Sequence, residues 1–302
     1  MMILPFVPPE PVTTSARHGF DYVTVDAQRR RVYAAHGGNA SLLIVNADTG
    51  KVLGQVHVGR MAGVAVNQAT GHVYTGDGED KALSEVDPVT MKEVHRVSVD
   101  GPVDAIAYDP QLHRIYGDED DGTRIFVIDS RSFKQIATIA LPGHKPEYIV
   151  IDPKTHAVYQ NIATNSEIAV IDPKSMKVVR TIATPEIKNN HPLQFDEMNR
   201  TLIVGGGGHL SVYALNGKRL GTAAFPRIDQ CTLDQRRQVL ACAGGGGVWF
   251  YSISKNGAPK QMGMRKISRG VHTVGIDEKT PRAWAVWGSP QGDFIQGFTY
   301  KF

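Results

Sequence analysis

The chain is poor in cysteine, in net charge and in long apolar runs. It has 302 residues, two of them cysteine, and its 33 Lys and Arg against 30 Asp and Glu give a formal net charge of +3. A balance so near zero gives no indication of a nucleic-acid or membrane-surface role. No apolar run approaches the roughly 18 residues that a membrane span needs, so we expect no membrane span.

The N-terminus lacks the features of a signal peptide. Residues Met1–Pro9 read MMILPFVPP, with neither a basic segment nor a long apolar segment. The chain is therefore either cytosolic or a mature extracytoplasmic protein without its leader.

Two common active-site signatures are also missing. There is no Gly-x-Ser-x-Gly motif, which disfavours a hydrolase with a serine nucleophile. The runs Gly205–Gly208 and Gly244–Gly247 are not followed by Lys-Ser or Lys-Thr, so they are not phosphate loops. Glycine runs permit tight turns with positive φ. They would also leave one side of a pocket free of side chains.

What the sequence does contain is an internal repeat. An Asp or Asn that begins a turn recurs every 38 to 44 residues, and seven positions after it stands a residue that is usually large and often tyrosine. The seven anchors are Asp26, Asn67, Asp109, Asp152, Asp196, Asp234 and Asp277. A fixed short offset indicates a fixed hairpin, whereas the variable remainder indicates loops.

Each unit reads as four short strands, because apolar residues alternate with period two around the anchor. Four strands in about 40 residues is typical of a propeller blade. We therefore predict an all-β, seven-bladed β-propeller with four antiparallel strands per blade, forming a single domain over residues 1–302. The last unit stops early, so residues 3–14 are predicted to supply its outer strand and close the ring, which removes exposed sheet edges.

The units 157–161 (AVYQN) with 168–172 (IAVID), and 72–75 (HVYT), resemble the YVTN-type β-propeller repeat. The resemblance covers the whole chain. It implies an extracytoplasmic protein of mixed possible function, and it informs fold and compartment more than activity.

Cys231 and Cys242 occupy matching positions on the two strands of the sixth hairpin. The hairpin register makes them direct cross-strand neighbours, whose Cβ atoms lie about 4.5–5.5 Å apart. A disulfide fits if the two residues form a non-hydrogen-bonded pair, and it would favour an oxidising compartment. Two small buried side chains are the alternative.

Titratable residues recur five positions before the anchors, where inner strands begin at one end of the channel. We call this end the mouth. With the loops beside them, these positions predict a ligand site formed by His18, Asp21, His36, Asp104, His144, Glu147, His191, Asp229 and His272.

Crowded carboxylates in a poorly hydrated funnel repel one another, which favours a cationic ligand or a divalent metal ion. The possible metal ligands are His191, Asp229, His272 and Asp21, since imidazole with carboxylate suits zinc or a transition metal. No cofactor is certain. Solvated polar residues without function are the alternative. If the chain is an enzyme, which the sequence leaves uncertain, we expect a lyase or lactone hydrolase with His272 or His191 as the base.

The opposite end, which we call the turn face, carries the anchor turns and is rich in Arg, Lys and His, including the runs at 29–31 and 236–237. Such a ring favours phosphate or nucleic acid, but aromatic residues for base stacking are missing there. The leading interpretation is a periplasmic or secreted propeller that binds a small molecule, a metal or a protein partner at the mouth.

Overall fold

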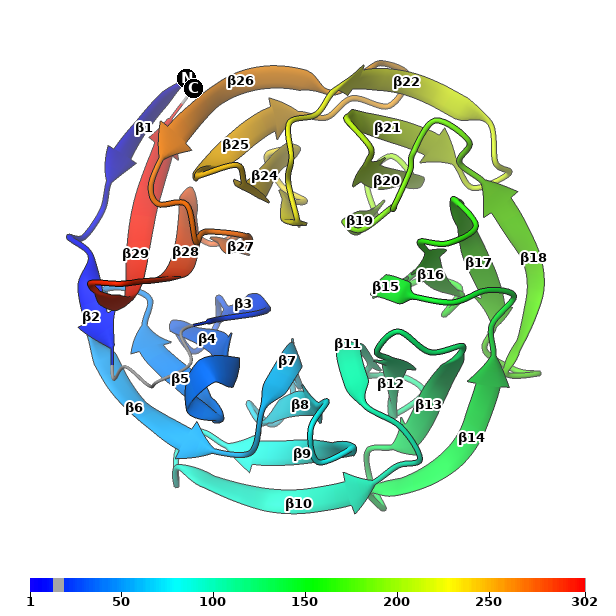
Figure 1. Cartoon of the computed structure of the whole chain (residues 1–302), viewed down its shortest axis with the longest axis horizontal. Helices are drawn as coiled ribbons and strands as arrows, with labels where there is room; N and C mark the ends of the chain where they lie inside the picture. Colours follow the sequence, from blue (N-terminus) through cyan, green and yellow to red (C-terminus); the bar gives the residue numbers. More distant parts are fainter. Residues whose placement is uncertain (13–18, 302) are drawn as a thin grey trace.

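A computed structural model describes residues 1–12 and 19–301. Seven antiparallel sheets stand around a central channel, each with its first strand innermost (Figure 1). The all-β, seven-bladed fold with four antiparallel strands per blade is therefore confirmed. Within the described ranges, one short 3-10 turn, Gly37–Asn39, is the only helical element, and no helix is long and apolar enough to cross a membrane.

The strands run in chain order from the channel to the rim of each blade. Blades 1 to 3 contain β3 (Val23–Asp26), β4 (Arg31–His36), β5 (Ser41–Asn46), β6 (Val52–His57), β7 (Met61–Val66), β8 (Val73–Asp77), β9 (Ala82–Asp87), β10 (Lys92–Ser98), β11 (Val103–Asp109), β12 (Arg114–Glu119), β13 (Arg124–Asp129) and β14 (Lys134–Ala140). Blades 4 to 6 contain β15 (Pro146–Ile151), β16 (Val158–Ile162), β17 (Glu167–Asp172), β18 (Lys177–Ala183), β19 (Leu193–Asp196), β20 (Thr201–Gly206), β21 (His209–Ala214), β22 (Arg219–Ala224), β23 (Gln230–Asp234), β24 (Val239–Gly244), β25 (Gly247–Ser252) and β26 (Lys260–Lys266).

Blade 7 is assembled from both ends of the chain. Its inner strands are β27 (Thr273–Asp277), β28 (Arg282–Ser289) and β29 (Gly292–Lys301), and the N-terminal strands β1 (Met2–Pro5) and β2 (Glu10–Val12) pair antiparallel with β29. The two termini consequently lie side by side (Figure 1). This pairing closes the ring; residues 13 and 14 of the predicted closing segment lie outside the described residues.

The anchor residues explain why every unit makes the same turn. Each anchor side chain is buried and accepts hydrogen bonds from backbone N–H groups two or three residues further on; Asp234 does so from Arg236 and Arg237. This is the local bonding by which Asp and Asn favour turns. Across the hairpin, large residues face small ones: Trp284 lies opposite Gly275, and Tyr74 opposite Ala65.

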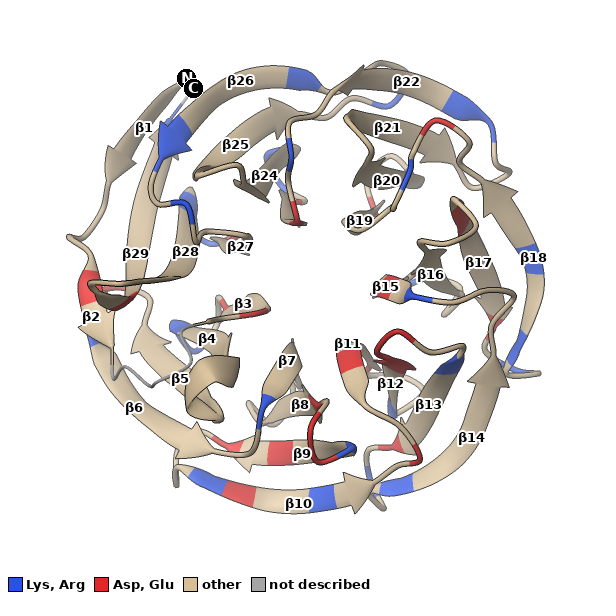
Figure 2. Ribbon diagram, in the orientation of Figure 1, with Lys and Arg blue, Asp and Glu red and all other residues tan. Residues whose placement is uncertain are grey.

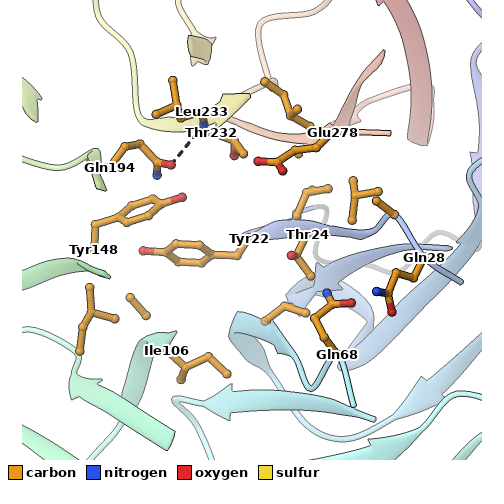
Figure 3. Close-up of a pocket in the computed structure, with 18 residues that line it drawn as sticks. Tyr22, Thr24, Gln28, Gln68, Ile106, Tyr148, Gln194, Thr232, Leu233 and Glu278 are labelled. Carbon is orange, nitrogen blue, oxygen red and sulfur yellow. Dashed lines mark hydrogen bonds between the residues drawn. The ribbon is translucent and has the colours of Figure 1, made fainter. Parts of the chain in front are cut away.

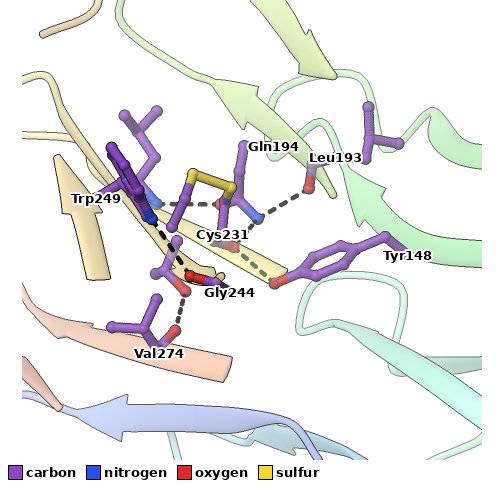
Figure 4. The surroundings of a disulfide bond; sticks show 10 residues. Tyr148, Leu193, Gln194, Cys231, Gly244, Trp249 and Val274 are labelled. Carbon is purple, nitrogen blue, oxygen red and sulfur yellow. Dashed lines mark hydrogen bonds between the residues drawn. A yellow bond between two sulfur atoms is a disulfide. The ribbon is translucent and has the colours of Figure 1, made fainter. Parts of the chain in front are cut away.

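The cysteine prediction is confirmed. Cys231 pairs with Cys242 in the β23–β24 register and the two form a disulfide, with 4.0 Å between their Cα atoms. The bond lies in the inner hairpin of blade 6 (Figure 4). The Cys231 carbonyl accepts hydrogen bonds from the Tyr148 hydroxyl and the Gln194 amide, each at 2.9 Å. The disulfide therefore supports contacts that reach two other blades.

Candidate functional site

The charged residues of the mouth come from different blades and meet around one end of the channel (Figure 2). Their shared position at the start of the inner strands brings them together because the ring is closed. His191 and His272 form three connected ion pairs with Glu147 and Asp229, and further carboxylates form a group of their own.

His191 is held between two carboxylates. Its Nε2 lies 2.9 Å from Glu147 Oε2 and 3.5 Å from Asp229 Oδ1. Burial disfavours the imidazolium, but the hydrogen bond and charge of Glu147, together with the charge of Asp229, raise the pKa of His191 to about 9. The buried Nδ1 atom has no hydrogen-bond partner among the described residues. His191 is therefore a fixed positive charge with one unused nitrogen.

His272 lies between two acceptors. Its Nδ1 is 2.9 Å from Asp229 Oδ2, and its Nε2 is 2.7 Å from the carbonyl oxygen of Phe20. Both nitrogens can satisfy these contacts only by donating, which requires the imidazolium. Although burial opposes it, the hydrogen bond that His272 donates to Asp229 raises the pKa of His272.

Protonation of the two imidazoles bears on the predicted catalytic roles. An imidazolium donates hydrogen bonds but has no lone pair with which to accept a proton. His191, with a pKa of about 9, is not in the form that a general base requires near neutral pH. The two acceptors around His272 favour its imidazolium as well. Both are suited to binding or to proton donation.

Asp21, Asp104 and Asp118 form the carboxylate group. Burial raises the pKa of Asp21 to about 6, although His272 and a hydrogen bond from Gln230 oppose this. Burial and the charges of Asp21 and Asp118 raise the pKa of Asp104 well above its usual value. Burial likewise raises the pKa of Asp118, which nevertheless accepts hydrogen bonds from the Ala105 N–H and the Gln160 amide. The group holds negative charge only at a cost in free energy.

The mouth is hollowed differently on its two sides. Over blades 1 to 3 there is an acidic pocket of about 570 Å³. Among the described residues it is lined by the carboxylates Asp21, Glu79, Asp104 and Asp120 and by the cation Arg60. Over blades 4 to 7 there are two pockets, of about 540 and 440 Å³, which share Arg227, Ile228 and Asp229. They are also lined by Lys145, Glu147, His191, Arg269 and His272. The mouth thus has an acidic side and a mixed, more basic side.

The glycine runs lie on the basic side. Gly206, Gly207 and Gly208 all have positive φ. A Cβ at Gly206 would lie 2.6 Å from the Lys188 carbonyl oxygen, and one at Gly244 would lie 2.6 Å from Ile228 Cα. The runs are therefore tight turns that pack closely on the neighbouring loops. Glycines of both runs also line the two pockets. The runs therefore make tight turns and also leave part of the pocket walls without side chains.

Two predicted histidines, His36 and His144, do not join the site. His36 is fully buried, stacks on Phe20 and pairs with Asp293 of blade 7 at 2.9 Å, so it is unavailable to a ligand. The prediction that His36 contributes to a ligand site is therefore wrong. His144 is exposed on its loop and does not line the mouth pockets described above. His18 lies outside the described residues.

No group of three or more His, Cys, Asp or Glu side chains suited to holding a metal ion occurs among residues 1–12 and 19–301. His191 Nε2 and both nitrogens of His272 contact carboxylates or a carbonyl instead. A metal at Asp21, Asp229 and the two histidines stays a prediction without support from the geometry.

The arginines of the turn face are engaged between blades. Arg200 pairs with Asp152 of blade 4, and Arg30 pairs with Asp277 of blade 7. Arg114 donates to the carbonyl of Pro173 in the next blade. Since these guanidinium groups already have partners in the fold, the turn face is a set of inter-blade links as well as a basic surface.

Sequence reasoning missed Tyr22 and Tyr148. They occupy the same repeat position, four before the anchors of blades 1 and 4, and their ring centroids lie 5.3 Å apart. The other five units have Gly63, Ala105, Pro192, Gln230 and Thr273 at this position. The sequence signal was that only two of the seven units have an aromatic residue at this position.

No protein-family model matches the sequence, and no curated protein matches it. The structure is similar to "Kuenenia stuttgartiensis Hydrazine Synthase", with a TM-score of 0.80 at 14% identity over 94% of this chain and 96% of that one. It is also similar to the β-propeller domain of "Myceliophteria_thermophila Cps50 (Swd1)", with a TM-score of 0.78 at 10% identity over 97% and 100% of the two chains. At these identities the likeness shows the fold alone, and the YVTN-type similarity stays a resemblance in repeat pattern.

Proposed function

We propose that this chain is an extracytoplasmic propeller whose mouth binds a small organic cation. The acidic pocket carries the proposal. Asp104 lines it, and no hydrogen bond or ion pair within the described ranges engages the Asp104 carboxylate. Its ionisation is opposed by burial and by the charges of Asp21 and Asp118. A cation in the pocket would offset both effects.

An organic cation fits better than a metal ion. The pocket of about 570 Å³ is within the size range of small-molecule sites. Metal ions need several ligand atoms converging on one point, and the described residues contain no such group. A metal, or a protein partner that presents a cationic side chain, would be the competing occupant.

The disulfide supports the proposed compartment. Disulfides persist in the periplasm and outside the cell and are rare in the cytosol, and Cys231 and Cys242 are bonded to each other. The function proposed is therefore binding in a periplasmic or secreted setting.

Calorimetric titration with choline and putrescine, with acetate as the matched anion, tests the proposal. We expect both cations to bind, and to bind more tightly as the pH rises through about 6, where Asp21 ionises. Asp104→Asn should weaken binding at least about tenfold, because a charge-assisted contact is lost. Asp100→Asn is the control: Asp100 is an exposed carboxylate, 94% accessible, outside the pocket.

The same variant has a stability readout. Without ligand, Asp104→Asn removes a repelled buried carboxylate, so unfolding free energy should rise by about 0.5–2 kcal/mol. Equal choline binding by the wild type and Asp104→Asn would rule out this pocket. Binding of Zn²⁺ or Ca²⁺ without binding of either organic cation would show that the ligand class is wrong.

A further inference from the structure

The channel contains a second cavity, at the end opposite the mouth. This turn-face cavity has a volume of about 490 Å³ (Figure 3). Nine of its 18 lining residues are aliphatic, Ile106 and Leu233 among them, and its rim carries Gln28, Gln68 and Glu278 beside the anchor turns. The volume is within the range of small-molecule sites.

Tyr22 and Tyr148 separate this cavity from the mouth. Both tyrosines line its inner end, and their side chains extend toward each other across the channel (Figure 3). Among the described residues, the acidic pocket and the turn-face cavity have no lining residue in common. The two ends of the channel therefore present different sets of side chains.

The polar groups of the turn-face cavity are mostly uncharged, and several are unused. No hydrogen bond within the described part of the chain engages the Gln28 or Gln68 side-chain amides or the Thr24 hydroxyl. Each such group can both donate and accept. Gln194, by contrast, is fully engaged with the backbone of blades 5 and 6.

Tyr22 adds a buried donor at the inner end. Its side chain is 8% exposed, and its hydroxyl has no hydrogen-bond partner among the described residues. Burial and the nearby carboxylates Asp104 and Asp21 raise its pKa well above the usual value, so the hydroxyl keeps its proton. A buried hydroxyl without a partner costs free energy, and a ligand hydroxyl at this point would supply one.

The charge of the lining limits the ligand class. In the part of the chain that the structure describes, no Lys, Arg or His lines the cavity, and Glu278 is the one charged residue that does. An anion would meet no compensating charge, and a cation would meet a single carboxylate that already accepts from the Gln235 N–H. Hydroxyl groups match amides and hydroxyls that both donate and accept.

We propose that the turn-face cavity binds a small uncharged molecule rich in hydroxyl groups, such as a monosaccharide, a disaccharide or a cyclic polyol. Its hydroxyls bond to Thr24, Gln28 and Gln68, its inner end reaches Tyr22, and its C–H faces pack on the aliphatic walls. This site does not depend on the mouth.

Calorimetric titration of the full chain with glucose, sucrose and myo-inositol tests the assignment. We expect at least one of the three to bind. Tyr22→Phe should weaken that binding about tenfold or more, because it leaves a ligand hydroxyl unpaired at a buried position. Gln68→Leu should also weaken it, by a smaller factor, because Gln68 lies on the exposed rim. Tyr33→Phe is the matched control, since Tyr33 is a buried tyrosine of the same blade that does not line the cavity.

A competition experiment separates the two ends. Choline at saturating concentration should not displace the sugar. The assignment is wrong if none of the three probes binds the folded wild type, if Tyr22→Phe and Gln68→Leu bind like the wild type, or if choline displaces the sugar. Unchanged near-ultraviolet circular dichroism of both variants shows that loss of binding is not loss of folding.

Discussion

The mouth and the turn-face cavity are built by the same inner strands but have opposite chemistry. At the mouth, Glu147 and Asp229 pair with His191 and His272, while Asp21 and Asp104 belong to a group of crowded carboxylates. A few residues further along the same strands, amides, hydroxyls and aliphatic side chains line the cavity. The fold determines which end of the channel each strand position faces. The residue at that position determines whether that end is charged or neutral. One ring can thus hold two unlike sites.

The disulfide supports both ends, and its removal should have the largest effect. In Cys231→Ser with Cys242→Ser, loss of a bond that closes an 11-residue separation should lower the unfolding free energy by about 2–4 kcal/mol. Gln230, which donates a hydrogen bond to Asp21 of the acidic pocket, and Thr232, which lines the turn-face cavity, flank Cys231 on either side. Choline and sugar binding should therefore both weaken. Denaturant unfolding and the two titrations measure this. Loss of binding at one end alone would contradict a shared support.

The pH dependence of stability should come mainly from the mouth. The folded-state pKa of His191, about 9, is raised above its ordinary value of 6.5. Its stabilising contribution is therefore complete below 6.5 and is lost as the pH rises through about 9. The shift corresponds to at most about 3 kcal/mol.

His191→Gln should remove this loss of stability between those two pH values. Thermal unfolding followed across that range is the measurement. His144→Gln is the control, because His144 is exposed and lies outside the mouth pockets. If the wild type and His191→Gln have parallel pH profiles, the His191–Glu147 pair does not titrate as described.

The repeat allowed most of the fold to be predicted, because the anchor turn and the strands around it are local. The same hairpin register placed Cys231 opposite Cys242. Contacts between distant parts of the chain were beyond reach. His36 is buried by Asp293, a residue 257 positions away, and Tyr22 meets Tyr148 only across a closed ring. A single repeat unit carries no information about such partners.

The smallest expected effect is at the one charged residue of the turn-face cavity. Burial raises the pKa of Glu278 above 4.5, so its ionisation costs some stability as the pH rises above that value. Glu278→Gln should remove this cost, and we expect a gain of less than about 0.5 kcal/mol, as for most partly exposed positions. Denaturant unfolding on either side of 4.5 measures it. If Glu278→Gln changed stability more than His191→Gln does, a charge in the cavity would affect stability as strongly as the charges of the mouth. An uncharged ligand would then be the wrong class for the cavity. A gain within the expected limit leaves hydroxyl-bearing ligands as the class that this end of the channel can hold.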